Sequence, residues 1–248
     1  MSGISRRLLL ESGIVAALPL VGIAAEDEAA KAAKKVMVIG AHPGDPEAGC
    51  GGTMARYADA GHEVVSVYLT RGEAGLRGKS AKEAAEIRSA EAEAACKILK
   101  ARPLFLEQAD GATEVNAARY VEFAKAIESE KPDVVFTHWP LDSHADHRAC
   151  FSLTYGTWVK LKRAFALYFY EVDLGSDTVG FGPTDYVDVT AFEARKRAAC
   201  FAHASQGPDG GFYTKDHEPM MRFRGMECGC KLAEGFIRQS QGRVGLLE

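Results

Sequence analysis

The sequence has little excess charge of either sign, and it lacks a run of lysine and arginine side chains. Its 30 Lys and Arg residues are nearly balanced by 34 Asp and Glu residues, for a formal net charge of -4. A nucleic-acid-binding surface needs clustered basic side chains, often interleaved with aromatic ones. Neither pattern is present, so the composition gives no reason to expect a nucleic acid as a partner.

A long hydrophobic run is also missing. A membrane-spanning helix takes about 20 apolar residues, whereas the apolar run at 13–22 is shorter and Glu11 interrupts its approach. The pair Arg6-Arg7 precedes this run, and small residues follow it at 23–25. An arginine pair before a short apolar stretch resembles a twin-arginine export signal.

We therefore expect an exported protein, periplasmic or secreted, with no stable membrane span after the signal is cleaved. The expected domains are an export signal at 1–25, a polar spacer at 26–34 and a single domain at 35–248. A cytoplasmic protein or one anchored by its N-terminus is the alternative.

The six cysteines do not form the pattern of a disulfide framework. Cys96 and Cys200 lie inside apolar helical patterns, which predicts that they are buried as small hydrophobic side chains. The Cys228-Gly229-Cys230 motif has no matching second pair, so a zinc knuckle is not expected.

Buried β-branched runs alternate with helical patterns along the chain. The runs predict strands at 35–40, 63–69, 103–106, 133–137 and 167–171. Helical patterns lie between them at 51–60, 81–99, 117–129 and 149–160. This alternation predicts an α/β, Rossmann-like layered fold with a mainly parallel central sheet flanked by helices. We expect the segment 207–224, which has glycines and charges without period, to be a long surface loop.

Two groups of residues suited to chemistry follow predicted strands. His42 and Asp45 come directly after the first strand, and His144, Asp146 and His147 come shortly after the fourth. Ligands of an open parallel sheet bind beyond the carboxyl ends of the strands, and strands one and four are often neighbours there. We therefore expect the two groups to converge.

His42, Asp45 and His147 together offer two imidazoles and one carboxylate, a usual ligand set for hydrolytic zinc with one position left for water. Zinc lowers the pKa of its bound water to about 7, and that water can attack a carbonyl. Each residue alone has a plainer explanation, because a histidine after a strand is often a loop residue and Asp45 or Asp146 can be a helix N-cap. The two clusters together favour the metal site.

These motifs resemble the LmbE-like / PIG-L deacetylases, zinc-dependent enzymes that act on molecules containing N-acetylglucosamine. The resemblance rests on the two histidine clusters and extends over nearly all the chain after Lys34, through weaker segments near Arg71, Arg88, Asp110 and His203.

The resemblance implies a role for each matching residue. His42, Asp45 and His147 would hold Zn2+, although other divalent transition metals remain open. His144 would stabilise the tetrahedral oxyanion, and Asp146 would orient a histidine. The substrate-binding residues would be Arg71 and His203.

The sequence departs from the family at the general base. The family has an aspartate directly after His-Pro, where this chain has Gly44, and Pro46 displaces the following glutamate to Glu47. Glu47 would be a substitute base, or Asp146 or His144 would take the proton.

The expected activity is removal of an acetyl or other acyl group from an N-acylated amino sugar or glucosamine conjugate, by attack of zinc-bound water. The alternative is a metal- and sugar-binding family member with reduced or altered catalysis, because Gly44 replaces the base. A nucleotide-binding Rossmann protein is disfavoured, since no G-x-G-x-x-G motif opens a helix. The partner is a small amino sugar, and assembly into a homo-oligomer stays open.

Overall fold

The computed structural model describes residues 33–173, 177–207 and 212–243. The expected export signal at 1–25 and nearly all of the spacer at 26–34 lie outside these residues. Within the described residues, no helix is both long enough and apolar enough to cross a membrane.

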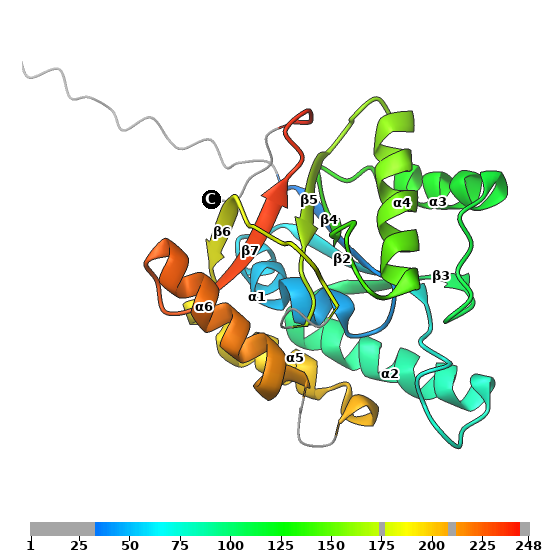
Figure 1. Ribbon diagram of the computed structural model, residues 1–248, viewed down its shortest axis with the longest axis horizontal. Coiled ribbons are helices and arrows are strands. Elements are labelled where there is room, and N and C mark those ends of the chain that lie inside the picture. The colour runs from blue at the N-terminus through cyan, green and yellow to red at the C-terminus, as the bar shows by residue number, and fades with distance from the viewer. Residues whose placement is uncertain (1–32, 174–176, 208–211, 244–248) are drawn as a thin grey trace, which may run out of the picture. The chain divides into compact units, whose positions relative to one another are not determined.

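The described residues form one seven-stranded sheet with helices on both faces (Figure 1). The strand order is β3-β2-β1-β4-β5-β7-β6. The strands are β1 Lys35–Gly40, β2 Glu63–Thr70, β3 Arg102–Gln108, β4 Val134–His138, β5 Ala166–Tyr170, β6 Asp185–Asp188 and β7 Ala233–Arg238. β1 to β5 pair in parallel, whereas β7 runs antiparallel between β5 and β6. The predicted α/β, mainly parallel, Rossmann-like fold is confirmed.

Six α-helices flank the sheet in the described part of the chain. They are α1 Asp45–Asp59, α2 Ala81–Leu99, α3 Ala117–Glu130, α4 Ala145–Lys160, α5 Glu193–Phe201 and α6 Glu218–Cys228. Short helical turns lie at η1 Thr190–Phe192, η2 Ala204–Gln206 and η3 Tyr213–His217.

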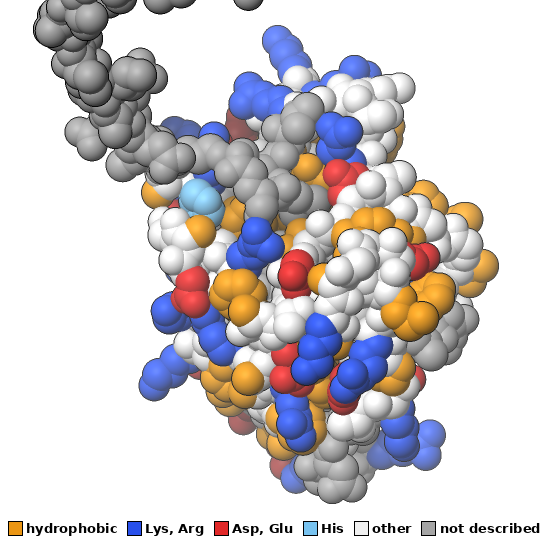
Figure 2. All heavy atoms as spheres, turned by 90° about the vertical axis from the view of Figure 1, so that its left-hand side faces the viewer, with side chains coloured by type: hydrophobic (Ala, Val, Ile, Leu, Met, Phe, Trp, Pro, Cys, Tyr) orange, Lys and Arg blue, Asp and Glu red, His pale blue; other side chains and the backbone are white. Residues whose placement is uncertain are grey.

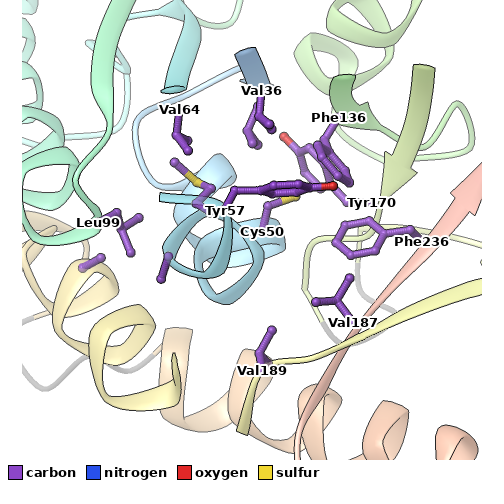
Figure 3. Close-up of a cluster of buried hydrophobic side chains, with 14 of the residues drawn as sticks. Val36, Cys50, Tyr57, Val64, Leu99, Phe136, Tyr170, Val187, Val189 and Phe236 are labelled. Carbon is purple, nitrogen blue, oxygen red and sulfur yellow. The ribbon is translucent and has the colours of Figure 1, made fainter. Parts of the chain in front are cut away.

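Alternating side chains of the buried strands feed two separate cores. Met37 and Ile39 of β1 face α3 and α4, where Phe123 and Leu153 join the same cluster. Val36 and Val38 belong to the other cluster, because successive side chains of a strand point to opposite faces. Figure 3 shows this second core, where Cys50 of α1 and Leu99 of α2 lie with the strand side chains.

Two predicted helices begin earlier than their apolar patterns suggested. α1 starts at Asp45 rather than Gly51, and α4 starts at Ala145 rather than Ala149. The first turn of each helix carries polar residues, Asp45 and Glu47 in α1 and Asp146 and His147 in α4, so hydrophobic periodicity alone did not include it. The helix starts therefore lie at the candidate site.

The prediction of a long surface loop at 207–224 is wrong over its C-terminal part. Tyr213–His217 forms a single π-helical segment, and α6 begins at Glu218. Pro219 stands in the first turn of α6, where its missing N–H is not needed. Met220, Met221 and Arg224 are buried although the segment looks polar in sequence. Packing of α6 against β7, in the antiparallel part of the sheet, outweighs its weak periodicity.

All six cysteines are free thiols, and Cys96 and Cys200 are buried as expected. On the face shown in Figure 2, Lys and Arg side chains are dispersed among acidic and apolar ones rather than gathered into a stripe.

Candidate active site

The candidate site lies at the carboxyl ends of β1 and β4, which are hydrogen-bonded neighbours. From β1 the chain moves to β2 and β3 on one side, and from β4 it moves to β5 on the other. This reversal is the topological switch point, where open α/β sheets bind their ligands. The two histidine clusters therefore meet as the sequence predicted.

The turn between β1 and α1 fixes His42 and Asp45. The carboxylate oxygen Asp45 Oδ2 accepts a hydrogen bond of 2.8 Å from the His42 backbone N–H, and the Asp45 N–H donates to the His42 carbonyl at 3.2 Å. Gly44 precedes α1 with φ 109° and ψ -33°, a conformation that side-chain-bearing residues rarely adopt. The turn thus presents both side chains on one side.

The first turn of α4 carries the second cluster. His144 is its N-cap residue, and the His144 Nδ1 atom accepts a hydrogen bond of 3.2 Å from the Asp146 N–H. Asp142 Oδ1 accepts from the His144 N–H at 2.8 Å and lies 3.0 Å from His147 Nδ1. The ring of His144 packs on those of His42 and His147, each at a centroid distance of 4.7 Å.

The predicted metal ligands converge on one carboxylate oxygen. Asp45 Oδ2 lies 3.3 Å from His42 Nδ1 and 3.5 Å from His147 Nε2. Donor atoms of several His and Asp side chains here lie within 4.8 Å of one another, in the overlapping sets His42-His144-His147, Asp45-His138-His147 and His42-Asp110-Asp146.

The outward nitrogens of both imidazoles contact other carboxylates. His42 Nε2 lies 3.0 Å from Asp110 Oδ1 and 3.2 Å from Asp146 Oδ2, while His147 Nδ1 faces Asp142. A carboxylate behind a histidine fixes the ring and its tautomer and leaves the inner nitrogen for a metal. The inner nitrogens here are those that face Asp45. His42, Asp45 and His147 are not one of the three sets by themselves, but each belongs to at least one of them, so the cluster offers the imidazole and carboxylate donors that zinc binds.

The protonation of the site reflects its crowding with carboxylates. Burial lowers the pKa of His42, but the charge of Asp45 and the contacts with Asp110 and Asp146 outweigh it and raise that pKa well above its usual value. The pKa of His147 is likewise raised, because Asp45 and Asp142 outweigh its burial. Burial acts to raise the pKa of Asp45, yet the two histidines hold it well below its usual value. The carboxylates around both rings thus favour a positive charge at this place.

His138, at the end of β4, is a neighbour that the sequence analysis missed. Its ring stacks on that of His147 at a centroid distance of 4.0 Å, and its Nε2 lies 3.2 Å from Asp45 Oδ2. However, His138 Nε2 accepts a hydrogen bond of 3.1 Å from the Ala41 N–H. Burial lowers its pKa to about 4, so the ring is neutral. The Ala41 hydrogen bond occupies the lone pair that a metal would need.

A pocket of about 190 Å³ opens beside Asp45 and His147. Its walls include five further polar side chains: Arg88, Asp173, His203, Gln206 and His217. Arg88 is buried and donates from Nη2 to the Pro43 carbonyl at 2.7 Å and from Nη1 to the Gly72 carbonyl at 3.2 Å. Its Nε has no partner among the described residues. The pocket is thus lined by hydrogen-bonding groups as well as by the metal-binding set.

Of the two predicted substrate-binding residues, His203 lines this pocket and Arg71 does not. Arg71 forms an ion pair with Glu107, donates to Ser89 Oγ at 2.8 Å and lies over the Phe105 ring. Arg88 is the arginine that lies in the pocket. The sequence signal that could have identified Arg88 is its place among the buried alanines of α2. A charged side chain is rarely buried unless it has partners, so its burial indicates a specific role.

Glu47, a predicted substitute base, is fully buried and is not among the residues that line the pocket. Its carboxylate accepts hydrogen bonds from Tyr68 Oη, from Ser66 Oγ at 3.3 Å and from the Gly44 N–H at 3.1 Å. Asp146, the other predicted carboxylate, accepts from the Gly111 N–H at 2.7 Å and from Thr113 Oγ1 at 2.6 Å. Both carboxylates are therefore held in place.

Comparison with known proteins places this site in a family. The PIG-L profile, described as GlcNAc-PI de-N-acetylase, matches residues 37–157, which contain both histidine clusters. A diacetylchitobiose deacetylase from Thermococcus kodakarensis is 34% identical over 122 residues, which are 46% of this chain and 45% of that protein. The matched part of the chain therefore spans less than half the length of that relative.

Solved structures resemble the chain over most of its length. An N,N'-diacetylchitobiose deacetylase from Pyrococcus horikoshii, complexed with an inhibitor, has a TM-score of 0.74 and 28% identity over 84% of this chain and 85% of its own. A 4-carboxy-2-hydroxymuconate hydratase from Pseudomonas putida also has a TM-score of 0.74, at 21% identity over 87% of this chain and 100% of its own, and that likeness concerns the fold. On its motifs, its fold and these matches, the chain belongs to the PIG-L (LmbE-like) family.

Proposed function

We propose that this protein is a zinc-dependent amide hydrolase that removes an acetyl group from an N-acylated amino sugar. The observation that carries the proposal is the arrangement around Asp45. Two imidazoles turn their inner nitrogens toward one carboxylate oxygen, and further carboxylates stand behind both rings. The deacetylases among the similar proteins supply the substrate class.

In this proposal His42, Asp45 and His147 hold the zinc ion. A bound zinc ion supplies Lewis acidity and lowers the pKa of water to about 7. Asp110 and Asp146 keep His42 oriented, and Asp142 does the same for His147. Removing such a supporting carboxylate typically weakens metal affinity about 10- to 100-fold.

His144, beside the metal-binding set, and Arg88, in the pocket wall, bind and polarise the substrate in this proposal. His144 stands beside His42 and His147, with its Nε2 free of the hydrogen bond that Nδ1 makes, so it donates to the developing oxyanion. Arg88 has its guanidinium fixed by two backbone carbonyls and one N–H unpaired, which suits it to a sugar hydroxyl or the acyl oxygen.

The test is amine release from N-acetylated sugars, N,N'-diacetylchitobiose first, by the zinc-loaded chain. We expect turnover that is abolished by a chelator and restored by zinc. The Asp45→Asn variant should lose both zinc and turnover, while Asp59→Asn, which changes an exposed ion pair at the far end of α1, should keep both. Stoichiometric zinc without amine release from any acylated amino sugar would contradict the proposal.

A second candidate function follows from Gly44, which carries no side chain at the position of the expected base. It is a metal- and sugar-binding protein with reduced or altered catalysis. Binding of N-acetylglucosamine by the zinc-loaded chain, together with no measurable turnover, would favour this candidate over the first.

Export is part of the same proposal, motivated by the arginine pair at Arg6-Arg7 and the short apolar run after it. The full chain should be found outside the cytoplasm and shortened at its N-terminus, and Arg6→Lys/Arg7→Lys should retain it inside the cell. Cell fractionation with mass measurement of the mature chain decides this.

A further inference from the structure

Amide hydrolysis needs a group that accepts a proton from the attacking water, and the pocket wall offers few. The titratable side chains that line it are Asp45, His147, Asp173, His203 and His217, besides the cationic Arg88. Asp45 and His147 belong to the metal-binding set. Gly44, between Pro43 and Asp45, brings no side chain. Asp173, His203 and His217 therefore remain as candidates.

His203 lies directly against the place that a side chain at position 44 would occupy. A Cβ atom on Gly44 would lie 3.9 Å from His203 Cγ and 4.0 Å from His203 Cδ2. The backbone of His203 is fixed on both sides, because its N–H donates to the Cys200 carbonyl at 3.2 Å and its carbonyl accepts from the Gln206 N–H at 3.0 Å. The ring thus fills the side of the pocket that Gly44 leaves open.

The two ring nitrogens of His203 have no hydrogen-bond partner among the described residues. Neither Nδ1 nor Nε2 makes a hydrogen bond within the described part of the chain, although the side chain is fully buried. Buried polar atoms nearly always have partners, so such a pair calls for an occupant of the pocket, water or substrate. A neutral imidazole offers one lone pair and one N–H, which is the equipment of a general base.

Glu47 stands behind this imidazole. Glu47 Oε2 lies 3.5 Å from His203 Nε2, and catalytic contacts of this kind are often long before substrate binds. Because Tyr68, Ser66 and the Gly44 N–H hold the Glu47 carboxylate, it cannot turn into the pocket itself. It can keep an N–H on His203 Nε2, which leaves the lone pair on Nδ1.

We propose that His203, oriented by Glu47, is the proton acceptor for the water that attacks the acyl carbonyl. The inference rests on the proposed amide hydrolase function and names the base of that site. As the water oxygen bonds to the carbonyl carbon, one water proton passes to His203 Nδ1. When the C–N bond breaks, that proton is returned to the amine nitrogen, so the products are the carboxylic acid and the free amine. Glu47 is a positioning residue in this scheme.

His217 is the nearest rival, since it also lines the pocket and pairs with a carboxylate. Its Nε2 lies 3.4 Å from Asp173 Oδ1. Asp173 has a third of its side chain exposed, whereas the Glu47 carboxylate is fully buried. Of the two histidines, His203 is the one that adjoins the turn carrying Asp45.

The experiment compares His203→Ala with His217→Ala, each zinc-loaded, with and without added imidazole. Loss of a general base costs about 10²- to 10⁴-fold in kcat, so we expect that loss in His203→Ala, with partial recovery by imidazole. His217→Ala should show no recovery. Zinc content and circular dichroism confirm that both chains are folded and loaded, and His203→Gln replaces the alanine variant if that one does not fold.

Glu47→Gln tests the positioning role, with an expected fall in kcat at unchanged KM and zinc content, and partial recovery in Glu47→Asp. An active wild type with imidazole-insensitive His203 variants, or recovery in His217→Ala instead, would overturn the inference alone. A wild type that releases no amine overturns the proposed function and this inference with it.

Discussion

At the scale of single residues, the site is defined by how its carboxylates are distributed. Asp45 faces inward between two histidines, whereas Asp110, Asp142 and Asp146 stand behind the rings. Aspartate thus has two roles here. It is a candidate metal ligand where it faces the inner nitrogens of the histidines, and it orients a ring where it faces an outer nitrogen. Gly44 also matters at this scale, because its backbone conformation shapes the turn that carries Asp45.

Zinc binding should release protons from the site. The pKa of His42 is raised well above its usual value by its carboxylate neighbours, which outweigh its burial. In the zinc-free chain this ring keeps a proton near neutral pH, and the metal must expel it. Affinity for zinc should therefore rise with pH and weaken as pH falls, as measured by calorimetry at about pH 6 and about pH 8 in buffers of different ionisation enthalpy. An affinity that is independent of pH would mean that His42 is not a ligand.

A side chain at position 44 should destabilise the fold. Although a Cβ atom there meets nothing closer than 3.9 Å, the φ of 109° disfavours any residue except glycine. Gly44→Ala should cost about 1–3 kcal/mol of unfolding free energy, measured with urea on the zinc-free chain. Gly182→Ala is the matched control, since its Cβ would enter open space without positive φ, and it should change little. Equal effects of the two substitutions would contradict this prediction.

The same strain applies to Gly44→Asp, so restoring the expected aspartate would also require the turn to change. Pro46 follows in the first turn of α1, so both positions at which the chain departs from the family motif belong to the turn that carries Asp45.

At the scale of elements, a buried ion pair joins three parts of the fold. Lys196 of α5 donates to Glu234 Oε1 of β7 at 2.7 Å, and both side chains are almost fully buried. The Glu234 carboxylate also accepts from the N–H groups of Gly52 and Thr53 in α1, each at 2.8 Å. The pair thus fastens α1 and α5 to the antiparallel strand.

Lys196→Met should be strongly destabilising because it leaves the Glu234 charge buried without its partner. We expect a loss of about 3–5 kcal/mol, measured by urea unfolding. In the control Lys100→Met, which breaks an exposed pair with Asp59, the loss should be under about 1 kcal/mol. If Lys196→Met were as mild as its control, the pair would not hold these elements together.

At the scale of the whole molecule, the candidate metal site couples the two halves of the parallel sheet. Asp45 and His42 follow β1, which leads into one half, and His147 belongs to α4 after β4, which leads into the other. A metal held by both clusters is lost when the sheet unfolds, so its binding free energy adds to the stability of the fold.

Zinc should therefore raise the unfolding temperature of the entire domain. At a free zinc concentration of 100 times the dissociation constant, the gain is about 2.7 kcal/mol. Differential scanning calorimetry with zinc and with a chelator measures it, and Asp45→Asn should remove the difference. A zinc-dependent shift that persists in Asp45→Asn would point to a different metal site.

The sequence by itself determined the parallel core and the neighbourhood of the two histidine clusters. Runs such as Val36-Met37-Val38-Ile39 are buried on both faces, and such runs with helical patterns between them permit little other than a layered sheet. This topology also brings together the polar groups that follow two adjacent parallel strands.

Only the tertiary structure decided the antiparallel edge and α6, because these short, weakly patterned segments gain their stability from contacts with distant residues. It alone separated Arg88 from Arg71, and it placed Glu47 behind His203 rather than in the pocket. Such assignments depend on the direction of a side chain in three dimensions, which hydrophobic periodicity and motif spacing do not specify.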